Sequence, residues 1–502
     1  MTEQELNIPL EIVESDNLYR DVRIKKMEEL REMGVNPYPY KFEKTHDALL
    51  LQEKYAELAM GEETNDKVIV AGRIMAYRNS GMFIDLQDVT GRIQVFCHKN
   101  RLDEQQLKVI SLFDLGDIIG VYGYIRRTPR GELTINAEKV DLLSKSLLPL
   151  PEKYHGLTDK EVRYRQRYLD LIMNESTRVT LRNRSKIIAS IRQYLNGLDF
   201  LEVETPMLHS IFGGAAALPF STHHNTLNMK LYLRVAPELY LKRLIVGGLS
   251  EKVFELNRCF RNEGISFKHN PEFTSIEIYQ AYADFSDMMD LTENIISYVA
   301  ETVFGTLDFE YDGKQISFKG PWARRSMLDL IHDVTNVHFG ELDNEQAYQE
   351  AKKLGIDVPK GANWGKIVEA VFGEKVETKL IQPTHVTHFP REISPLARED
   401  RDNPRLTERF ESFVNGWELA NAFSELIDPI DQRGRFEQQM SERGAGDVEA
   451  HPMDEDFVTS LEYGMPPTGG LGIGIDRLIM LLTGSLTIRD VIAFPTLRPK
   501  TD

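Results

Sequence analysis

The stretch KVFELNRCFRNEGISFKHNPEFTSIEIYQAYADF, residues 252–285, decides the fold of the C-terminal half of the chain. Apolar and polar residues alternate before and after the segment GISFKHNP, which is typical of two strands joined by a turn-rich loop. The alternation places polar and aromatic side chains of both strands on one face of the predicted hairpin. These side chains are Arg261, Glu263, Phe273, Glu277 and Tyr279.

This face of the hairpin carries groups that suit a charged ligand with a flat base. The Arg261 guanidinium offers a fixed fork of donors for a phosphate or a carboxylate. Phe273 offers a flat surface for a base, and Glu277 at the far end suits an ammonium group. The alternative is an amphipathic hairpin whose polar face lies in water.

A second hairpin is predicted in RFESFVNGWELANAFSELIDP, residues 409–429. Asn-Gly is the strongest two-residue turn signal, so Asn415-Gly416 places Glu411 and Glu418 on one face as a diagonal pair. Two neighbouring carboxylates repel each other unless a cation lies between them, and beside a phosphate that cation is expected to be Mg2+. The alternative is a pair of exposed acids.

The end of this second segment leaves two structures open. Asn421 and Glu425 share a strand face with each other but not with Glu418, so a strand needs a bulge after Glu418. A helix would instead bring all three residues onto one face. The glycine turn before them and Asp428-Pro429 after them favour the strand.

Two glycine-rich segments complete the candidate site. PPTGGLGIGIDRLIMLLTG, residues 466–484, matches neither the dinucleotide fingerprint nor the phosphate-binding loop, but its glycines let a backbone approach a ligand. Arg477 at the following helix start would add its charge to the helix dipole and face an anion; close packing is the alternative. The run Gly213-Gly214-Ala215-Ala216 lets a backbone carbonyl reach a small ligand, and Glu238 is a candidate for binding an amine.

Residues 67–145 contain short runs that are rich in Val, Ile, Tyr and Phe, separated by glycine-containing breaks. The runs are KVIVAGRIMAY, MFIDLQD, GRIQVFCH, DIIGVYGYI and ELTINAEKV. This pattern predicts five strands, and five strands in so short a span suit a small oligonucleotide-binding barrel. The alternative is a β-barrel without a ligand.

The composition excludes several classes of protein. Of 502 residues, 41% are hydrophobic and only Cys97 and Cys259 are cysteines, which excludes a disordered chain, a disulfide scaffold and a cysteine-rich zinc cluster. The N-terminus has no apolar signal segment, and no apolar run is long enough to span a bilayer. We therefore expect a cytoplasmic protein without a membrane partner.

The charge balance gives a mixed indication about nucleic acids. A net charge of −18 argues against a general nucleic-acid binder, because phosphate affinity comes from clustered Lys and Arg. A local basic stripe still exists, although an ordinary solvated face is the alternative. Its members are Arg126, Arg127, Arg130, Arg163, Arg165 and Arg167.

These patterns predict an α+β protein of several parts. We expect a helical extension over residues 1–66, the barrel over 67–145 and a linker over 146–170. The remaining residues, 171–502, mix long helices with strands and read as one α+β domain. Within it, the charged stretch at about 290–380 is predicted to be a helical insertion.

Taken together and in this order, FRNEG…HNPEFT, ELANAFSEL and GLGIGIDR resemble the motifs of class II aminoacyl-tRNA synthetases, and among them of the lysyl-tRNA synthetases. The resemblance covers nearly the whole chain. It implies an N-terminal anticodon-binding OB-fold, an antiparallel catalytic sheet flanked by helices, and a homodimer whose interface includes residues 197–206. It further implies ligation of L-lysine to tRNA(Lys) through a lysyl-adenylate, with ATP as co-substrate and Mg2+ as cofactor.

The resemblance also implies roles for single residues. Arg261 and Arg477 would be catalytic, with Arg261 on the α-phosphate and Arg477 on the γ-phosphate. ATP would be held by Arg261, Glu263, His269, Asn270, Phe273, Glu411 and Arg477, and Mg2+ by Glu411 and Glu418. Lysine would be bound by Gly214 and Glu238 at the α-amine, by Arg261 and Asn421 at the carboxylate, and by Glu425 and Tyr279 at the ε-ammonium, with Glu277 beside them.

In the barrel, the resemblance implies that Phe83 stacks on an anticodon base, which is how single-stranded RNA is commonly read. Hydrogen bonds to base edges would come from Arg78, Gln94 and Glu132. The chain departs from the family at three places. Ser80-Gly81-Met82-Phe83 is shorter than the usual Gly-Lys-x-Ser-Phe and lacks its Lys, Leu218 stands where many members have Arg, and Ile427 replaces a frequent Asn.

Three other functions remain open at this point. Aspartyl- and asparaginyl-tRNA synthetases share the architecture, but they need a basic group for their substrates, whereas Glu238, Tyr279 and Glu425 favour a cation. A paralogue that lysylates a protein would lack the barrel. A non-catalytic RNA-binding relative would have lost Arg261, Arg477 or the acid pair, all of which are present.

Overall fold

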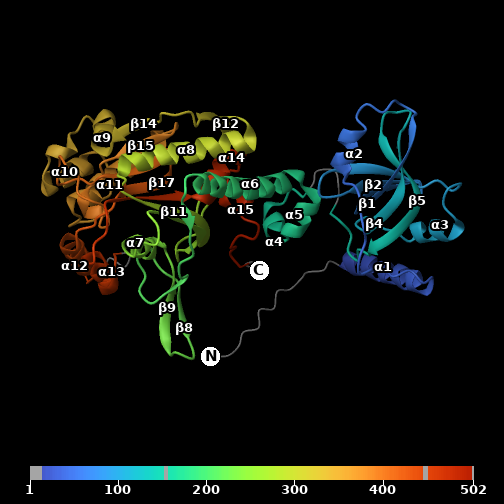
Figure 1. The fold of residues 1–502 in the computed structure, drawn as a ribbon, viewed down its shortest axis with the longest axis horizontal. Coiled ribbons are helices and arrows are strands. Elements are labelled where there is room, and N and C mark those ends of the chain that lie inside the picture. The colour runs from blue at the N-terminus through green and yellow to red at the C-terminus, as the bar shows by residue number, and fades with distance from the viewer. Residues whose placement is uncertain (1–13, 152–156, 445–449, 500–502) are drawn as a thin grey trace. The chain divides into compact units, whose positions relative to one another are not determined.

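Five strands of the N-terminal part close into a barrel in the order β1-β2-β3-β5-β4 (Figure 1). They are β1 (Glu63–Arg78), β2 (Phe83–Gln87), β3 (Arg92–Phe96), β4 (Ile118–Arg127) and β5 (Leu133–Ser144). Alternate aliphatic residues point inward, and Ile74, Ile84, Val95, Ile119 and Ile135 are fully buried. The expected five-stranded OB-fold is confirmed.

Three helices accompany the barrel in this computed structural model, which describes residues 14–151, 157–444 and 450–499. They are α1 (Glu14–Glu32), α2 (Ala48–Lys54) and α3 (Glu104–Ser111). Gly34, with a φ of +79°, follows α1 in the left-handed conformation that commonly ends a helix. The chain divides into two units, Met1–Gly156 and Leu157–Asp502.

The interval 146–170, expected to be a linker, is partly helical and partly buried. It contains α4 (Lys160–Arg165) and the start of α5 (Arg167–Met173). The fully buried Arg167 pairs with Asp170 and donates hydrogen bonds to the backbone oxygens of Arg489 and Ala493. Arg127 in the barrel likewise donates to backbone oxygens. These two arginines therefore stabilise the fold and do not form a solvated basic stripe.

An eight-stranded sheet forms the centre of the second unit, in the order β14-β15-β16-β17-β18-β11-β10-β6. Only the outermost pairs, β14–β15 and β10–β6, are parallel. The strands are β6 (Leu201–Glu202), β10 (Lys252–Phe260), β11 (Glu272–Ala281), β14 (Ala323–Ser326), β15 (Thr384–Thr387), β16 (Arg409–Val414), β17 (Trp417–Ser424) and β18 (Thr468–Gly474). The expected antiparallel catalytic sheet is thus confirmed.

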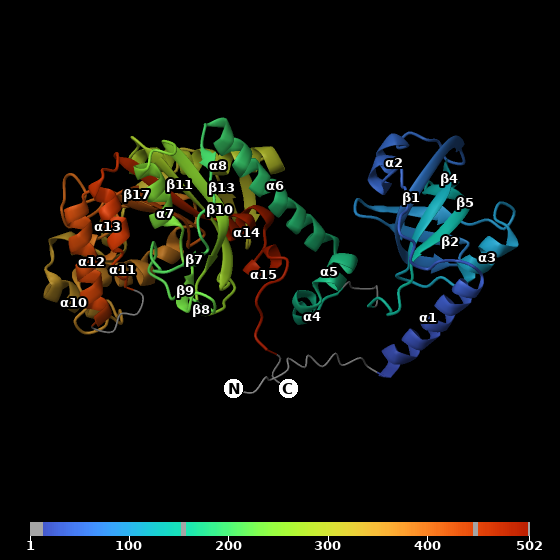
Figure 2. The same ribbon diagram turned by 60° about the horizontal axis from the view of Figure 1, so that its bottom comes forward.

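Helices cover one face of this sheet and leave the other face for a cavity. The covering helices are α6 (Glu175–Gly197), α8 (Phe285–Phe304) and α14 (Ile475–Thr483) (Figure 2). Their apolar stripes pack on sheet residues such as Ile276, Ile278 and Ile473, which are almost completely buried. The residues between these point to the opposite face, where α7 (Glu238–Val246) lies at one end.

The interval 290–380 is not the single helical insertion that the sequence suggested. Helix α8 belongs to the main core, and three short strands follow it: β12 (Asp308–Tyr311), β13 (Lys314–Ser317) and β14. Only the later helices pack around a cluster of their own, which includes Met327, Phe339, Trp364 and Val371. These helices are α9 (Met327–Thr335), α10 (Asn344–Lys353) and α11 (Trp364–Lys375).

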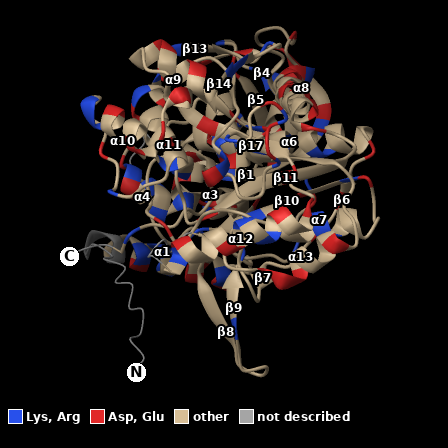
Figure 3. Ribbon diagram, turned by 90° about the vertical axis from the view of Figure 1, so that its left-hand side faces the viewer, with Lys and Arg blue, Asp and Glu red and all other residues tan. Residues whose placement is uncertain are grey.

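The remaining elements lie at the margins of the sheet. A small three-stranded sheet contains β7 (Leu208–His209), β8 (Ser221–His224) and β9 (Met229–Leu233), and β8 and β9 project as a hairpin (Figure 3). Acidic and basic residues are interspersed on α12 (Pro429–Gly444) and α13 (Glu455–Glu462), and the short α15 (Ile488–Val491) follows α14. Among the residues that the structure describes, no helix is long and apolar enough to cross a membrane.

Candidate active site

The predicted hairpin of residues 252–285 is present as β10 and β11, and its polar face lines a cavity of about 670 Å³. Cys259 lies opposite Phe273, Glu255 opposite Glu277, and Val253 opposite Tyr279. This register brings Phe273, Glu277 and Tyr279 to the cavity together with Arg261 and Glu263 from the loop. The prediction that one face gathers these residues is confirmed.

The second hairpin is present as β16 and β17, and the bulge after Glu418 is confirmed. Phe413 lies opposite Glu418, but Ser412 lies opposite Ala420, so one extra residue is inserted on β17 directly after Glu418. The bulge returns Asn421 to the face of the cavity, opposite Glu411. The helical alternative for this segment is therefore wrong.

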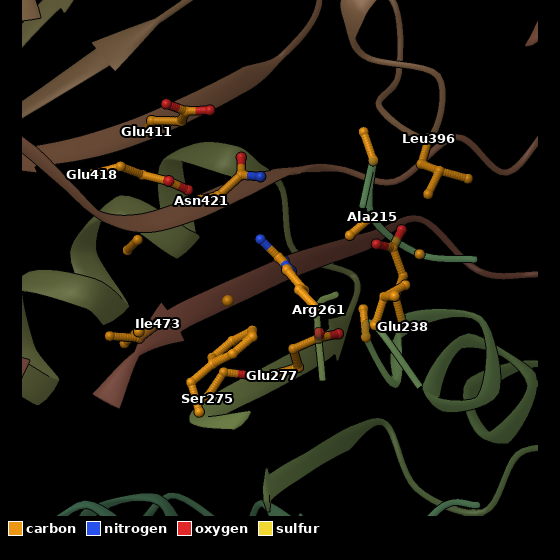
Figure 4. Close-up of a pocket in the computed structure, with 18 of the residues that line it drawn as sticks. Ala215, Glu238, Arg261, Ser275, Glu277, Leu396, Glu411, Glu418, Asn421 and Ile473 are labelled. Atoms are coloured by element: carbon orange, nitrogen blue, oxygen red, sulfur yellow. The ribbon is translucent and has the colours of Figure 1, made fainter. Parts of the chain in front are cut away.

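Arg261 lies in the middle of the cavity and makes no ion pair with the described residues. Figure 4 shows it between Glu411, Glu418 and Asn421 on one side and Glu238 and Glu277 on the other. Its guanidinium stacks on the Phe273 ring, 5.1 Å from the ring centroid, and its Nε is buried without a hydrogen bond. No ion pair joins Arg261 to any carboxylate among the described residues, so its charge is available for an anionic ligand.

One end of the cavity contains two acids that each have an arginine beside them. The Arg409 Nη2 lies 2.5 Å from Glu411 Oε1, and the Arg477 Nη1 lies 3.3 Å from Glu418 Oε2. Burial and the neighbouring Glu418 nevertheless raise the pKa of Glu411 to about 8. The two arginines therefore do not offset the cost of burying Glu411 beside a second carboxylate, and we call these four side chains the phosphate end of the cavity.

The two carboxylates could hold a metal ion only if a bound ligand supplied the remaining coordinating atoms. Among the described residues, no group of three or more His, Cys, Asp or Glu side chains could hold an ion alone. Glu411 and Glu418 supply two carboxylates, and phosphate oxygens suit the remaining positions around a hard cation. A cation beside Glu411 would favour the ionised carboxylate and so act against the rise in its pKa that burial causes.

The loop before β11 closes the phosphate end. His269 Nε2 lies 3.2 Å from Arg477 Nη2, and burial followed by the Arg477 charge lowers the pKa of His269, so that its ring is neutral and accepts this hydrogen bond. The Asn270 side chain donates to the Glu272 backbone oxygen and accepts from the Thr496 amide, so it shapes the loop. Glu263 is exposed at the cavity rim.

The opposite end of the cavity contains three acids in an apolar setting, and we call it the amine end. Glu238, Glu277 and Glu425 are all largely buried. Burial raises the pKa of Glu277 to about 8, although Tyr279 donates a hydrogen bond of 3.0 Å to it. Burial also raises the pKa of Glu238 and of Glu425. Three acids held in this way favour a positively charged ligand.

Glu425 differs from its expected position, because it lies immediately behind the cavity wall. It is not among the lining residues, and neither of its carboxylate oxygens has a partner in hydrogen-bonding geometry. The wall in front of it is Gly470, where a Cβ atom would lie 2.0 Å from Glu425 Oε1 and 2.7 Å from Tyr279 Cε1. The absence of a side chain at position 470 therefore leaves the space that Glu425 Oε1 and the Tyr279 ring occupy at the cavity wall.

Glycine is also required at position 214, on the wall facing the amine end. Gly214 has a φ of +89°, which favours glycine, and a Cβ atom there would lie 3.0 Å from the Glu238 Cβ. The close approach brings the backbone of residue 214 beside Glu238, and both residues line the cavity. Their expected contact with an α-amine stays a prediction.

Two basic residues of the site were missed by the sequence analysis. Lys242 is fully buried between Glu238, at 2.5 Å, and Glu425. Arg409 donates to Asn421 Oδ1 at 3.0 Å, which leaves the Asn421 amide group free to donate into the cavity. The available signals were the spacing of four residues between Glu238 and Lys242 on a helix, and the alternation of Arg409 with Glu411 on a strand.

The charges of the amine end do not balance without a ligand. Among the described residues, Lys242 pairs with two of the three acids, Glu238 and Glu425, and the nearby Arg234 is already paired with the buried Glu255 at 2.7 Å. Two more positive charges are needed when all three acids are ionised. A molecule with two ammonium groups and one anionic group, the latter on Arg261, matches this arrangement.

The residues expected to contact RNA lie together on the barrel surface. Phe83 lies opposite Arg78 on β1 and opposite Phe96 on β3, with its ring 4.8 Å from that of Phe96. Arg78 pairs with Asp85 at 2.6 Å, and Gln94 accepts a hydrogen bond from Thr134. Glu132 is exposed just before β5. Phe96, with Arg126 above its ring at 5.0 Å, extends this surface and was not predicted.

Comparisons with known proteins agree with both halves of this description. Residues 159–498 match the family model for class II tRNA synthetases (D, K and N), and residues 68–143 match that for the OB-fold nucleic acid binding domain. The chain is 56% identical to the lysine–tRNA ligase of Carboxydothermus hydrogenoformans over 95% of this chain and 98% of that protein. It is 53% identical to that of Sinorhizobium medicae, over 96% and 97%, and 56% identical to that of Nostoc sp., over 97% and 89%. The chain therefore belongs to the lysine–tRNA ligase family of class II tRNA synthetases.

Proposed function

We propose that this protein activates L-lysine with ATP to lysyl-adenylate and then transfers the lysyl group to tRNA(Lys). The observation that carries the proposal is the charge arrangement of the cavity. Arg261 makes no ion pair with a described carboxylate, and it lies between the Arg409 and Arg477 side chains of the phosphate end and the buried acids of the amine end, two of which share Lys242. L-Lysine and ATP supply the complementary groups.

Lysine is oriented by its three charged groups. Its α-ammonium lies in the recess of Gly214 and Glu238, with Glu277 beside it, and its ε-ammonium meets Tyr279 and Glu425. Its carboxylate lies between Arg261 and the amide of Asn421, which Arg409 orients. A neutral or acidic side chain would leave the buried Glu425 with only the Lys242 that it shares with Glu238, which costs several kcal/mol and gives the pocket its selectivity.

ATP occupies the other end of the cavity. Phe273 offers its ring to the adenine, Glu263, His269 and Asn270 form the covering loop, and Arg477 faces the γ-phosphate. The lysine carboxylate attacks the α-phosphorus, a bond to pyrophosphate breaks, and Arg261 stabilises the charge that develops on the α-phosphate. Catalysis is positioning plus electrostatic stabilisation by Arg261 and Arg477, without a covalent enzyme intermediate.

We further propose that the divalent cation of this reaction is Mg2+, held by Glu411 and Glu418. When bound, it neutralises phosphate charge and so assists the departure of pyrophosphate. In the second half-reaction, the terminal 3′-hydroxyl of the tRNA takes the lysyl group from the adenylate. The barrel surface around Phe83 selects the tRNA by stacking an anticodon base, with Arg78, Gln94 and Glu132 at base edges.

We also propose that the protein is a cytoplasmic homodimer. The support for a dimer is three exposed leucines in and near the edge strand β6 in the sequence, namely Leu198, Leu201 and Leu208. Exposed apolar groups next to a free sheet edge commonly mark a protein interface. Light scattering coupled to size exclusion tests the proposal, and a monomer at micromolar concentration contradicts it.

The test of the proposed function is ATP–pyrophosphate exchange, measured with each of the twenty amino acids in turn. We expect exchange with lysine alone, because only lysine supplies both ammonium groups at the right separation. Exchange with aspartate or asparagine would overturn the assignment of the amine end. Absence of exchange with any amino acid, in folded protein with Mg2+, would overturn the enzymatic function.

The role of the barrel is tested separately with Phe83→Ala in aminoacylation of tRNA. We expect kcat/KM for tRNA(Lys) to fall about tenfold or more, since stacking on an aromatic ring contributes about 1–3 kcal/mol per base. The matched control is Tyr40→Ala, which removes a fully exposed ring elsewhere in the same unit. Equal effects of the two substitutions would contradict the proposed anticodon surface.

A further inference from the structure

Lys242 is a buried cation that no step of the proposed reaction uses. Its side chain is inaccessible to solvent, and its ammonium contacts two carboxylates, Glu238 from the same helix and Glu425 from the segment after β17. It does not line the cavity. A buried lysine is costly unless it is paired, so this position needs an explanation.

We propose that Lys242 is a positioning residue for substrate selection: it is a built-in counter-ion that favours the ionised forms of Glu238 and Glu425 and aligns the two carboxylates before lysine arrives. This inference rests on the proposed function, because it assigns Glu238 to the α-ammonium and Glu425 to the ε-ammonium. It adds that the two recognition sites are one electrostatic unit, joined through Lys242. Lys242 supplies one positive charge from the protein, and the two ammonium groups of the lysine substrate supply two more.

The geometry supports a single coupled unit. Glu238 and Lys242 are four residues apart on α7, so their side chains lie on the same side of the helix. Glu425, from the segment after β17, contacts the same ammonium. The rings of Phe423 and Phe457 lie 5.4 and 5.7 Å from the Lys242 Nζ, and these contacts favour a cation at this point.

Lys242 is the basic residue that contacts both Glu238 and Glu425, and the other titratable groups around them are as follows. Helix α7 contributes Glu238 and Lys242, β11 contributes Glu277 and Tyr279, the segment after β17 contributes Glu425, β16 contributes Arg409, and the segment before α13 contributes His451. Burial lowers the pKa of His451 to about 4, so this ring is neutral. Arg409 is committed to Glu411 and Asn421.

The protonation directions agree with this geometry. Burial alone lowers the pKa of Lys242, but Glu238 and Glu425 outweigh it, and the net direction is upward, so the lysine is charged. For both acids, burial raises the pKa and Lys242 acts against that rise. Removal of the Lys242 charge therefore raises both pKa values further, and lysine must then displace protons that are held more tightly.

The experiment compares the pH profile of the lysine KM in ATP–pyrophosphate exchange between the wild type and Lys242→Met. We expect the lysine KM of the variant to be at least about tenfold higher at pH 7, with the difference shrinking towards pH 9 as the acids ionise; each pKa unit corresponds to a tenfold change. The KM for ATP should stay within about twofold, because ATP binds at the other end. Lys242→Gln is the second neutral variant, should the Met variant not fold.

Two further variants separate charge from packing. Lys242→Arg keeps the charge and should keep the wild-type shape of the pH profile, even if its size alters the KM. Leu241→Met changes the adjacent, fully buried residue by a volume-conserving swap and should behave as wild type in every measurement.

Each outcome decides between the proposals. A lysine KM that rises by the same factor at every pH in the neutral variants, or a shifted profile in Lys242→Arg, would show a merely structural role and overturn the inference. A wild-type protein that does not activate lysine at all would instead overturn the proposed function on which the inference rests. A profile that shifts only in the neutral variants supports both.

Discussion

The two ends of the cavity differ in how their acidic side chains are paired with basic residues and in how exposed these acids are. At the phosphate end, each acid has its own arginine, and the Glu418 side chain is 43% exposed. At the amine end, Glu425 is fully buried, and one lysine is shared between two acids. Ions from solvent can therefore reach the phosphate end. At the buried amine end, in contrast, only a bound ligand can neutralise the remaining negative charge.

We expect this difference to make the amine end the more selective of the two ends. Near solvent, a charge pair contributes little, because water and salt screen it, so the phosphate end tolerates ligands that differ in detail. In the buried end, an acid without a counter-charge is costly, so a substrate that lacks an ammonium group is rejected. Arg261 is the one group that serves both ends.

The largest effect is expected from Arg261→Ala, which tests whether the two ends meet at this residue. The rate of lysine-dependent exchange should fall about 10²–10³-fold or more, because a preorganised donor to the developing charge is lost. Binding of lysine and of ATP should weaken together. If only one of the two KM values changes, the two ends do not share Arg261.

The next effect in size concerns the closed end. Glu425→Gln should lower kcat/KM for lysine about 10²-fold or more, since a charge-assisted contact to a buried ammonium is removed. Discrimination against norleucine, which lacks the ε-ammonium, should fall at the same time. Glu437→Gln, an exposed acid on α12, is the matched control and should leave both values unchanged. Retained discrimination in Glu425→Gln would contradict the ε-ammonium site.

A smaller effect is expected from filling the gap in front of Glu425. In Gly470→Ala the new Cβ would lie 2.0 Å from Glu425 Oε1, so the acid or Tyr279 must move. We expect the lysine KM to rise roughly ten- to 100-fold, the equivalent of about 1–3 kcal/mol of overpacking, with little change in the ATP KM. Gly434→Ala on α12, where nothing lies within 4 Å of the added Cβ, is the control.

The smallest effect is a pH dependence of stability. The folded-state pKa of Glu277, about 8, is higher than its ordinary value of 4.5, so its contribution to stability is complete below about pH 4.5 and is lost as the pH rises through 8. Compared with Glu277→Gln, the ligand-free wild type should therefore lose a few degrees of Tm between pH 5 and 8. Saturating lysine should raise the wild-type Tm more at pH 8 than at pH 6. Parallel Tm curves for the two proteins would contradict the elevated pKa.

The alternation and turn signals were sufficient to predict much of the phosphate end from sequence. Asn415-Gly416 fixes the hairpin register, and parity then requires the bulge that brings Asn421 opposite Glu411. The faces of β10 and β11 followed from the same periodicity of two. These features are local, so a short stretch of sequence contains the information.

The amine end could not be predicted to the same extent, because it depends on long-range packing. Lys242 meets Glu425 across 183 positions of the chain, and no local pattern indicates that contact. Gly470 was expected only as one of several glycines that let the backbone approach a ligand, whereas in the structure it leaves room for the Glu425 carboxylate and the Tyr279 ring. The predicted linker at 146–170 and the predicted insertion at 290–380 were wrong for a similar reason. Arg167 bonds to the distant residue Ala493, and α8 packs in the main core, and neither contact leaves a local pattern in the sequence.

The most direct test of the central claim is a crystal structure of the protein with L-lysine and a non-hydrolysable ATP analogue in the presence of Mg2+. The account predicts the lysine carboxylate and the α-phosphate on Arg261, the α-ammonium beside Glu238, the ε-ammonium between Glu425 and Tyr279, and Lys242 still bridging its two acids. A lysine bound in the reverse direction, or with its carboxylate away from Arg261, would contradict it.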